Sequence, residues 1–154
     1  MRKIKSILLV SSLFLVTAIQ AQVDIKSQSL QSEKTEKGVK WVEAKTVIPG
    51  TIIRYVNTIS NDNEKVATNL EVVNHISKHM ELVSGTVKCE GGCDITYAVN
   101  LKEGYKSPSN LYVIDKKTGK SRLAMAKEYV SIKWVINTLE RNKSKMVQYE
   151  SKLK

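Results

Sequence analysis

The two cysteines of the chain, Cys89 and Cys93, are the first residues whose type and spacing suggest chemistry. They flank the turn Glu-Gly-Gly. A structural zinc site needs four ligands, and no second pair of cysteines is present to complete one. Thioredoxin-like redox sites space their cysteines by two residues at the start of a helix, whereas three residues separate them here. Because the chain also has the features of an exported protein, described below, we predict a Cys89–Cys93 disulfide that closes this turn.

The two histidines form the second candidate, since His75 and His79 have the i, i+4 spacing that pairs zinc ligands on a helix. The residues around them alternate as in a strand, however, and on a strand this spacing separates side chains by more than about 10 Å. Four acidic side chains lie in predicted loops: Asp62, Glu64, Glu90 and Asp94. The run Asn-Asp-Asn-Glu lacks the spaced ligands of a calcium loop. We expect no metal site and no cofactor.

Patterns typical of enzymes are missing from the sequence. It has no Gly-x-Ser-x-Gly elbow, no phosphate-binding glycine loop and no cysteine paired with a distant histidine. We therefore expect no catalytic residues and a protein that is not an enzyme.

Positive charge is concentrated in the last third of the chain. The whole sequence has 25 basic and 15 acidic side chains, of which 13 basic and five acidic ones lie between residues 102 and 154. An anionic envelope polymer such as lipopolysaccharide is one expected partner for this charge, and an ordinary solvated face is the alternative. The candidate anion-binding residues are Lys102, Lys106, Lys116, Lys117, Lys120 and Arg122. No nucleic acid is expected, because the basic residues are not interleaved with aromatic ones.

The first residues have the order of a secretory signal peptide. Arg2, Lys3 and Lys5 precede an apolar run over residues 7–19, and small residues follow, with cleavage after Ala18 or Ala21. The apolar run is shorter than the roughly 20 residues of a membrane-spanning helix, so a retained anchor is the weaker alternative. We predict a signal peptide over residues 1–21, one domain over residues 22–154 with no membrane span, and a location in the periplasm or at the cell surface.

The rest of the sequence reads as a series of short strands. Apolar residues alternate with polar ones in "TIIRYVNTI", "LEVVNHI", "ITYAVN", "VSIKWVI" and "MVQYESKL", and turn residues separate the runs. This pattern predicts an all-β antiparallel sandwich, with one helical turn in "LAMAKEYV". It places Trp134 inside, and Ala98, Ser131 and Lys133 on outer faces. Trp41 is expected in the core, with a partner surface as the alternative.

An ordered set of residues resembles the bacterial conserved-repeat domain family, catalogued as domain of unknown function eleven. The first half reads "PGTIIRYVNTISNDNEKVATNLEVVNHISKHMELVSGT" from Pro49, and "SRLAMAKEYVSIKWVI" resembles the family's Arg-x-Ala and Ile-Arg-Trp run. The resemblance implies an immunoglobulin-like sandwich of about seven to nine strands, with no agreed activity and no cofactor. The chain departs from the family at Asn74, in the following "ISKH" segment and in the loop over residues 100–104.

Together these patterns predict a non-enzymatic module of the cell envelope with a structural or protein-interaction role. The alternative is a binding protein for an anionic envelope ligand that uses the basic last third.

Overall fold

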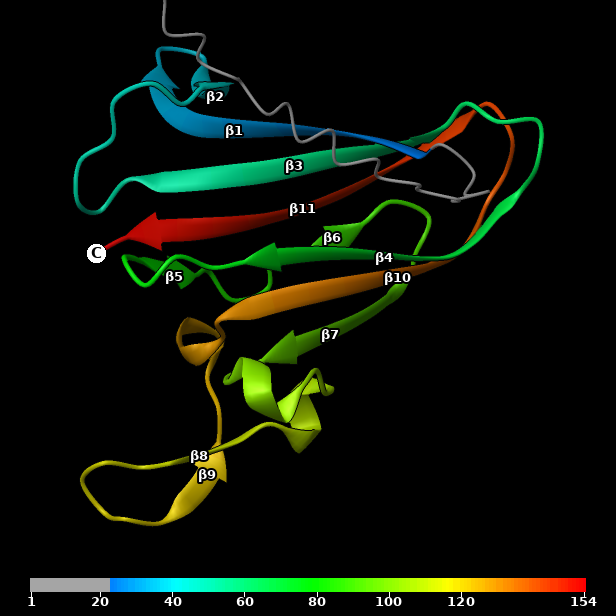
Figure 1. Cartoon of the computed structure of the whole chain (residues 1–154). Coiled ribbons are helices and arrows are strands. Elements are labelled where there is room, and N and C mark those ends of the chain that lie inside the picture. Colours follow the sequence, from blue (N-terminus) through cyan, green and yellow to red (C-terminus); the bar gives the residue numbers. More distant parts are fainter. Residues whose placement is uncertain (1–22) are drawn as a thin grey trace, which may run out of the picture.

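The computed structural model describes residues 23–154, which form an almost entirely β structure (Figure 1). The predicted signal peptide therefore lies outside the described residues. The strands are β1 (Val23–Thr35), β2 (Gly38–Glu43), β3 (Ile52–Asn61), β4 (Ala67–His75), β5 (Met80–Leu82), β6 (Lys88–Cys89), β7 (Asp94–Ala98), β8 (Tyr112–Ile114), β9 (Ser121–Leu123), β10 (Ser131–Leu139) and β11 (Lys143–Leu153). Three 3₁₀ turns join them: η1 (Leu101–Glu103), η2 (Pro108–Asn110) and η3 (Ala126–Glu128).

Two antiparallel sheets make up the body of the molecule. The larger has the order β2-β1-β3-β11-β5, with β6 also paired to β11, and the smaller has the order β4-β10-β7. The hairpin β8–β9 forms a separate small sheet and projects from the smaller sheet (Figure 1). The predicted all-β sandwich is confirmed. The described residues contain eleven strands rather than seven to nine, because four of the strands have three residues or fewer.

The core lies between the two sheets and follows the predicted alternation. Ile59 of β3, Val147 of β11 and Trp134 of β10 are fully buried. The Trp134 ring lies 6.1 Å from the ring of Tyr149, centroid to centroid, and so connects β10 to β11. Period-two patterning therefore predicted correctly that Trp134 of β10 faces the core.

Ala98 and Ser131 were predicted on outer faces, and that prediction is wrong, because both are fully buried. The chain after β7 folds back over them, and the backbones of Lys106 and Tyr97 exchange two hydrogen bonds of 2.9 Å. The Tyr105 hydroxyl then lies 2.8 Å from Ser131 Oγ, in hydrogen-bonding contact. Lys133, the third residue predicted outside, stays partly exposed, with its ammonium 5.1 Å from the Tyr105 ring centroid.

The helical turn predicted in "LAMAKEYV" is confirmed as η3, but it does not stand alone. In η1 the side chain of Asn100 accepts a hydrogen bond of 3.0 Å from the Lys102 amide, and Pro108 begins η2. Asn and Pro are both favoured at such starts, since the first supplies a capping oxygen and the second needs no N–H partner. Within residues 23–154, no helix is long and apolar enough to cross a membrane.

Candidate functional site

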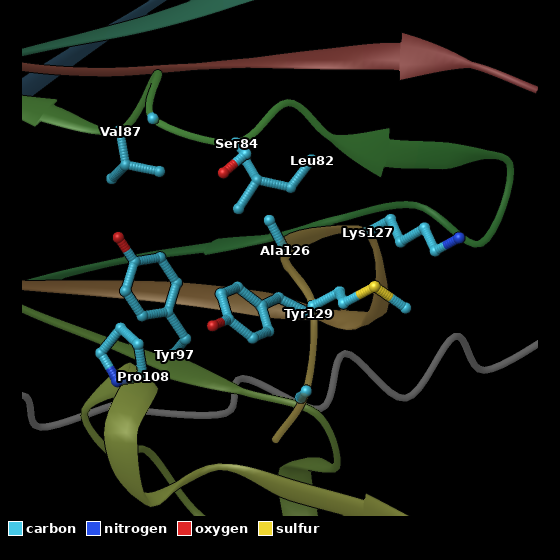
Figure 2. Close-up of a pocket in the computed structure, with 11 residues that line it drawn as sticks. Leu82, Ser84, Val87, Tyr97, Pro108, Ala126, Lys127 and Tyr129 are labelled. Carbon is cyan, nitrogen blue, oxygen red and sulfur yellow. The ribbon is translucent and has the colours of Figure 1, made fainter. Parts of the chain in front are cut away.

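A cleft of about 660 Å³ lies at one side of the sandwich (Figure 2). It opens between the segment from β5 to β6, whose strands belong to the larger sheet, and two elements on the other side: β7 of the smaller sheet and the turn η3. Its lining is mostly apolar: Leu82, Ser84, Gly85, Val87, Tyr97, Pro108, Ala124, Met125, Ala126, Lys127 and Tyr129. A cleft of this composition suits an apolar ligand group better than a charged one.

Two tyrosine rings form one wall of the cleft, on the side opposite Val87 and Ser84 (Figure 2). The centroids of Tyr97 and Tyr129 are 4.7 Å apart, and the rings are tilted by 33°. Burial raises the pKa of both phenols; Tyr129 further raises that of Tyr97, and the charge of Glu128 that of Tyr129. Both hydroxyls are therefore protonated at neutral pH and can exchange hydrogen bonds with a ligand, but they are not poised to act as nucleophiles.

The cleft wall at η3 is held by local hydrogen bonds. The Met125 amide donates to Glu128 Oε2 at 2.8 Å, and the Ala124 amide donates to the Leu111 carbonyl at 2.9 Å. The turn η3 also packs against β5, so it bridges the two sheets. The cleft is therefore a preformed feature of the fold.

Cys89 and Cys93 form a disulfide, as the sequence predicted. Cys89 ends β6, and Cys93 lies just before β7, so the bond closes the turn between the two sheets. Gly91 and Gly92 both have positive φ, at +65° and +77°, which glycine adopts without strain. The Lys145 ammonium donates to the Gly92 carbonyl at 2.8 Å and ties this turn to β11.

Replacing both cysteines with serine is expected to lower the free energy of unfolding by about 2 kcal/mol, because the disulfide closes only a short loop. Chemical denaturation of the oxidised protein and of the variant measures this difference. Thiol labelling of the unfolded, unreduced protein should find no free cysteine. Two reactive thiols in the protein recovered from its native compartment would contradict the assignment.

The predicted basic residues do not form one cluster. Lys116, Lys117 and Lys120 are exposed in the turn between β8 and β9. Lys102 lies in η1, and Lys106 lies beside β7, where its backbone pairs with Tyr97. A cavity lined by residues of the η1 loop and of the hairpin, among them Asn100, Glu103 and Ile114, lies between these regions.

Arg122, the sixth predicted residue, is engaged by two carboxylates. Its guanidinium donates to both oxygens of Glu128 at 2.7 and 2.8 Å, and to Asp115 Oδ2 at 3.1 Å. The pKa of Glu128 falls to about 2, chiefly through Arg122 and then through the Met125 amide. The pKa of Asp115 also falls to about 2, chiefly through the Thr118 amide and then through Arg122. Arg122 thus fastens the hairpin to η3, and its charge is balanced within the protein.

This ion-pair network predicts how the hairpin responds to acid. Both carboxyl pKa values are depressed, so the stabilisation they provide is complete above their ordinary values near 4 and is lost as the pH falls toward 2. In an NMR titration, Arg122→Ala should raise the pKa of Glu128 more than that of Asp115, because Asp115 keeps its bonds from the Lys117 and Thr118 amides. Equal shifts for the two carboxyls would contradict this division of roles.

The other residues singled out by the sequence do not assemble into a site. His75 ends β4, and His79 lies in the turn before β5. Among residues 23–154, no three metal-binding side chains lie together where they could hold a metal ion.

Trp41 is only half-buried, so its predicted place in the core is wrong. It lies against the Arg54 guanidinium, 3.8 Å from the ring centroid, and Arg54 in turn binds Glu150 at 2.6 Å. A cation–π contact on the sheet surface takes the place of core packing.

Sequence reasoning missed the cleft as a site. It predicted the helical turn at η3, but the opposite wall comes from the segment between β5 and β6, which has little periodicity.

No protein-family model matches the sequence, and neither a curated protein nor a solved structure matches it. The resemblance to the conserved-repeat family rests on the ordered residues quoted above.

Proposed function

We propose that this chain is a non-enzymatic, exported module of the cell envelope that binds another envelope protein through the cleft between β5–β6 and β7–η3. The observation that carries the proposal is the preformed, mainly apolar lining of this cleft, with two protonated tyrosine hydroxyls in one wall. Such a lining accepts an apolar side chain or a short extended segment, and the hydroxyls fix its orientation. We place the module in the periplasm or at the cell surface, on the basis of the signal-peptide pattern of residues 1–21.

The resemblance to the conserved-repeat family supports the same proposal, because it implies an envelope sandwich without catalytic residues. The two carboxyl groups whose pKa values are strongly lowered, those of Asp115 and Glu128, both form ion pairs with Arg122 of the hairpin. They serve as structural anchors there, which fits a binding module.

The test is site-specific photocrosslinking in the native organism, with the crosslinker placed at Ser84 at the rim of the cleft. Because Ser84 is exposed, the substitution should not disturb the fold. The protein captured is then purified, and its affinity for the chain is measured directly. We expect Ser84→Arg to weaken that affinity at least tenfold, because it places a long cation across an apolar opening.

Thr68→Arg provides the matched control, since Thr68 is exposed on β4 and is absent from the cleft lining. It adds the same charge and should change the affinity less than twofold. Equal effects of the two variants, or an unchanged affinity with Ser84→Arg, would refute the cleft as the binding site.

A second candidate function is the binding of an anionic envelope ligand. The observation that favours it is the exposed lysine group Lys116, Lys117 and Lys120 at the end of the projecting hairpin. Binding of this kind weakens steeply between low and physiological salt, because the charges are solvent-exposed. Titration of a soluble polyanion such as dextran sulfate at two salt concentrations tests it, and binding that is absent or insensitive to salt would exclude it.

A further inference from the structure

The hairpin β8–β9 exposes apolar side chains on one of its faces. Tyr112 and Leu123 are paired across the two strands, and Ile114 lies two residues beyond Tyr112, so all three side chains share one face. Their exposed fractions are 56%, 49% and 66%, and that of Met125, which follows the hairpin, is 48%. Side chains of this size are rarely left so exposed together without a partner surface.

The opposite face of the same hairpin is anchored to the body of the protein. Arg122 lies there with Val113, to which it is paired in the register, and its ion pairs reach Asp115 and Glu128. Lys116, Lys117 and Lys120 follow in the turn, and all three are exposed. The hairpin is thus an anchored projection with an apolar face and a cationic end, and its one acid, Asp115, is paired with Arg122.

We propose that this hairpin docks the protein onto an anionic lipid surface. Tyr112, Ile114 and Leu123 enter the interfacial region of the lipid layer, while the three turn lysines contact anionic headgroups. The proposal deepens the second candidate function above, since it names an anionic lipid as the ligand that the lysines bind.

Two features favour a lipid surface over a protein partner. The apolar face is a narrow strip on a projecting two-stranded ribbon, whereas a stable protein interface buries about 800 Å² on each partner. The charge of this part of the chain is also predominantly positive. Between residues 101 and 128 the chain has seven basic and three acidic side chains, and two of those acids are ion-paired with Arg122. This arrangement matches a surface that is uniformly anionic above an apolar layer.

The test is co-sedimentation of the chain from residue 22 onward with vesicles of phosphatidylglycerol and phosphatidylcholine, and with pure phosphatidylcholine as the neutral control. This chain lacks the apolar leader, which would bind vesicles by itself, and it contains every described strand. We expect binding to the anionic vesicles and at least tenfold weaker binding to the neutral ones. Changing Lys116, Lys117 and Lys120 together to glutamine should reduce anionic binding roughly 100-fold at low salt.

The apolar face is tested by the double substitution of Ile114 and Leu123 with serine, which should reduce anionic binding at least about tenfold. The matched control changes Val39 and Ile48 to serine, because these residues are at least as exposed as Leu123 but lie in β2 and in the loop after it, outside the hairpin. The control should bind within twofold of the original. Circular dichroism shows that each variant is folded.

The outcomes separate this inference from the function on which it rests. Binding that needs both the lysines and the apolar residues supports lipid docking. If the lysine variant loses binding and the Ile114 and Leu123 variant does not, lipid insertion is overturned and binding to anionic groups alone remains. Binding of dextran sulfate without binding to anionic vesicles leads to the same conclusion. If neither ligand binds, both the inference and the second candidate function fail.

Discussion

Replacing Trp134 with alanine is expected to lower the free energy of unfolding by about 3–5 kcal/mol, the largest effect of any single change considered. Trp134 is fully buried in β10 and contacts the ring of Tyr149 in β11. Its removal would leave a large cavity at the point where the two sheets meet. Because a domain of this size is stabilised by only about 5–15 kcal/mol, much of the variant should be unfolded under mild denaturing conditions. Urea denaturation followed by circular dichroism measures the change.

Trp134→Phe is the informative companion variant. The indole Nε1 is buried without a hydrogen-bond partner, so the native residue already bears the cost of an unmade bond. Phenylalanine removes that N–H while it keeps most of the ring volume. We expect it to cost less than 1.5 kcal/mol, since the smaller cavity is partly offset by the loss of an unpaired donor. A phenylalanine variant as unstable as the alanine one would mean that Nε1 has a partner.

The core of this fold was predictable because strand periodicity is a local property of the sequence. Trp134 was assigned to the inward face from alternation alone, and it is fully buried. The prediction that Ala98 and Ser131 lie on outer faces failed for a physical reason. The segment after β7 pairs with Tyr97, next to Ala98, and its Tyr105 hydroxyl contacts Ser131. Alternation within a strand contains no information about such a covering segment.

The candidate site was less predictable, because its walls come from segments distant in sequence. The walls of the cleft join residues near Leu82 to residues near Tyr129, and no local pattern links them. Arg122 shows a second limit of sequence-based prediction. It was predicted to bind an anionic ligand because it lies in the basic last third, but two carboxylates within seven residues of it in the chain already bind its guanidinium. The disulfide and the helical turn at η3 followed directly from the sequence, because each depends on residues close together in the chain.

Asn61 gives the second large expected effect, although in the sequence it stood out only as part of the Asn-Asp-Asn-Glu run and of the family resemblance. Its side chain is fully buried at the end of β3, where the amide donates 2.9 Å hydrogen bonds to the carbonyls of Lys65 and Leu139. Its oxygen accepts from the amide of Asn63 at 3.2 Å. One side chain thus holds the loop after β3 to the end of β10, across the two sheets.

Asn61→Ala should lower the free energy of unfolding by about 3 kcal/mol, because buried carbonyl groups lose their donors while remaining shielded from water. Asn137→Ala is the control: Asn137 is exposed on β10, and its replacement should lower the free energy of unfolding by no more than about 0.5 kcal/mol.

Asn61→Asp separates shape from hydrogen bonding, since it keeps the size and the accepting oxygen but removes both N–H donors. At neutral pH its carboxylate would face two carbonyl oxygens, so it should destabilise the protein at least as much as alanine does. An aspartate variant as stable as the original would show that packing, rather than donation by the Asn61 amide, holds the two sheets together at this end.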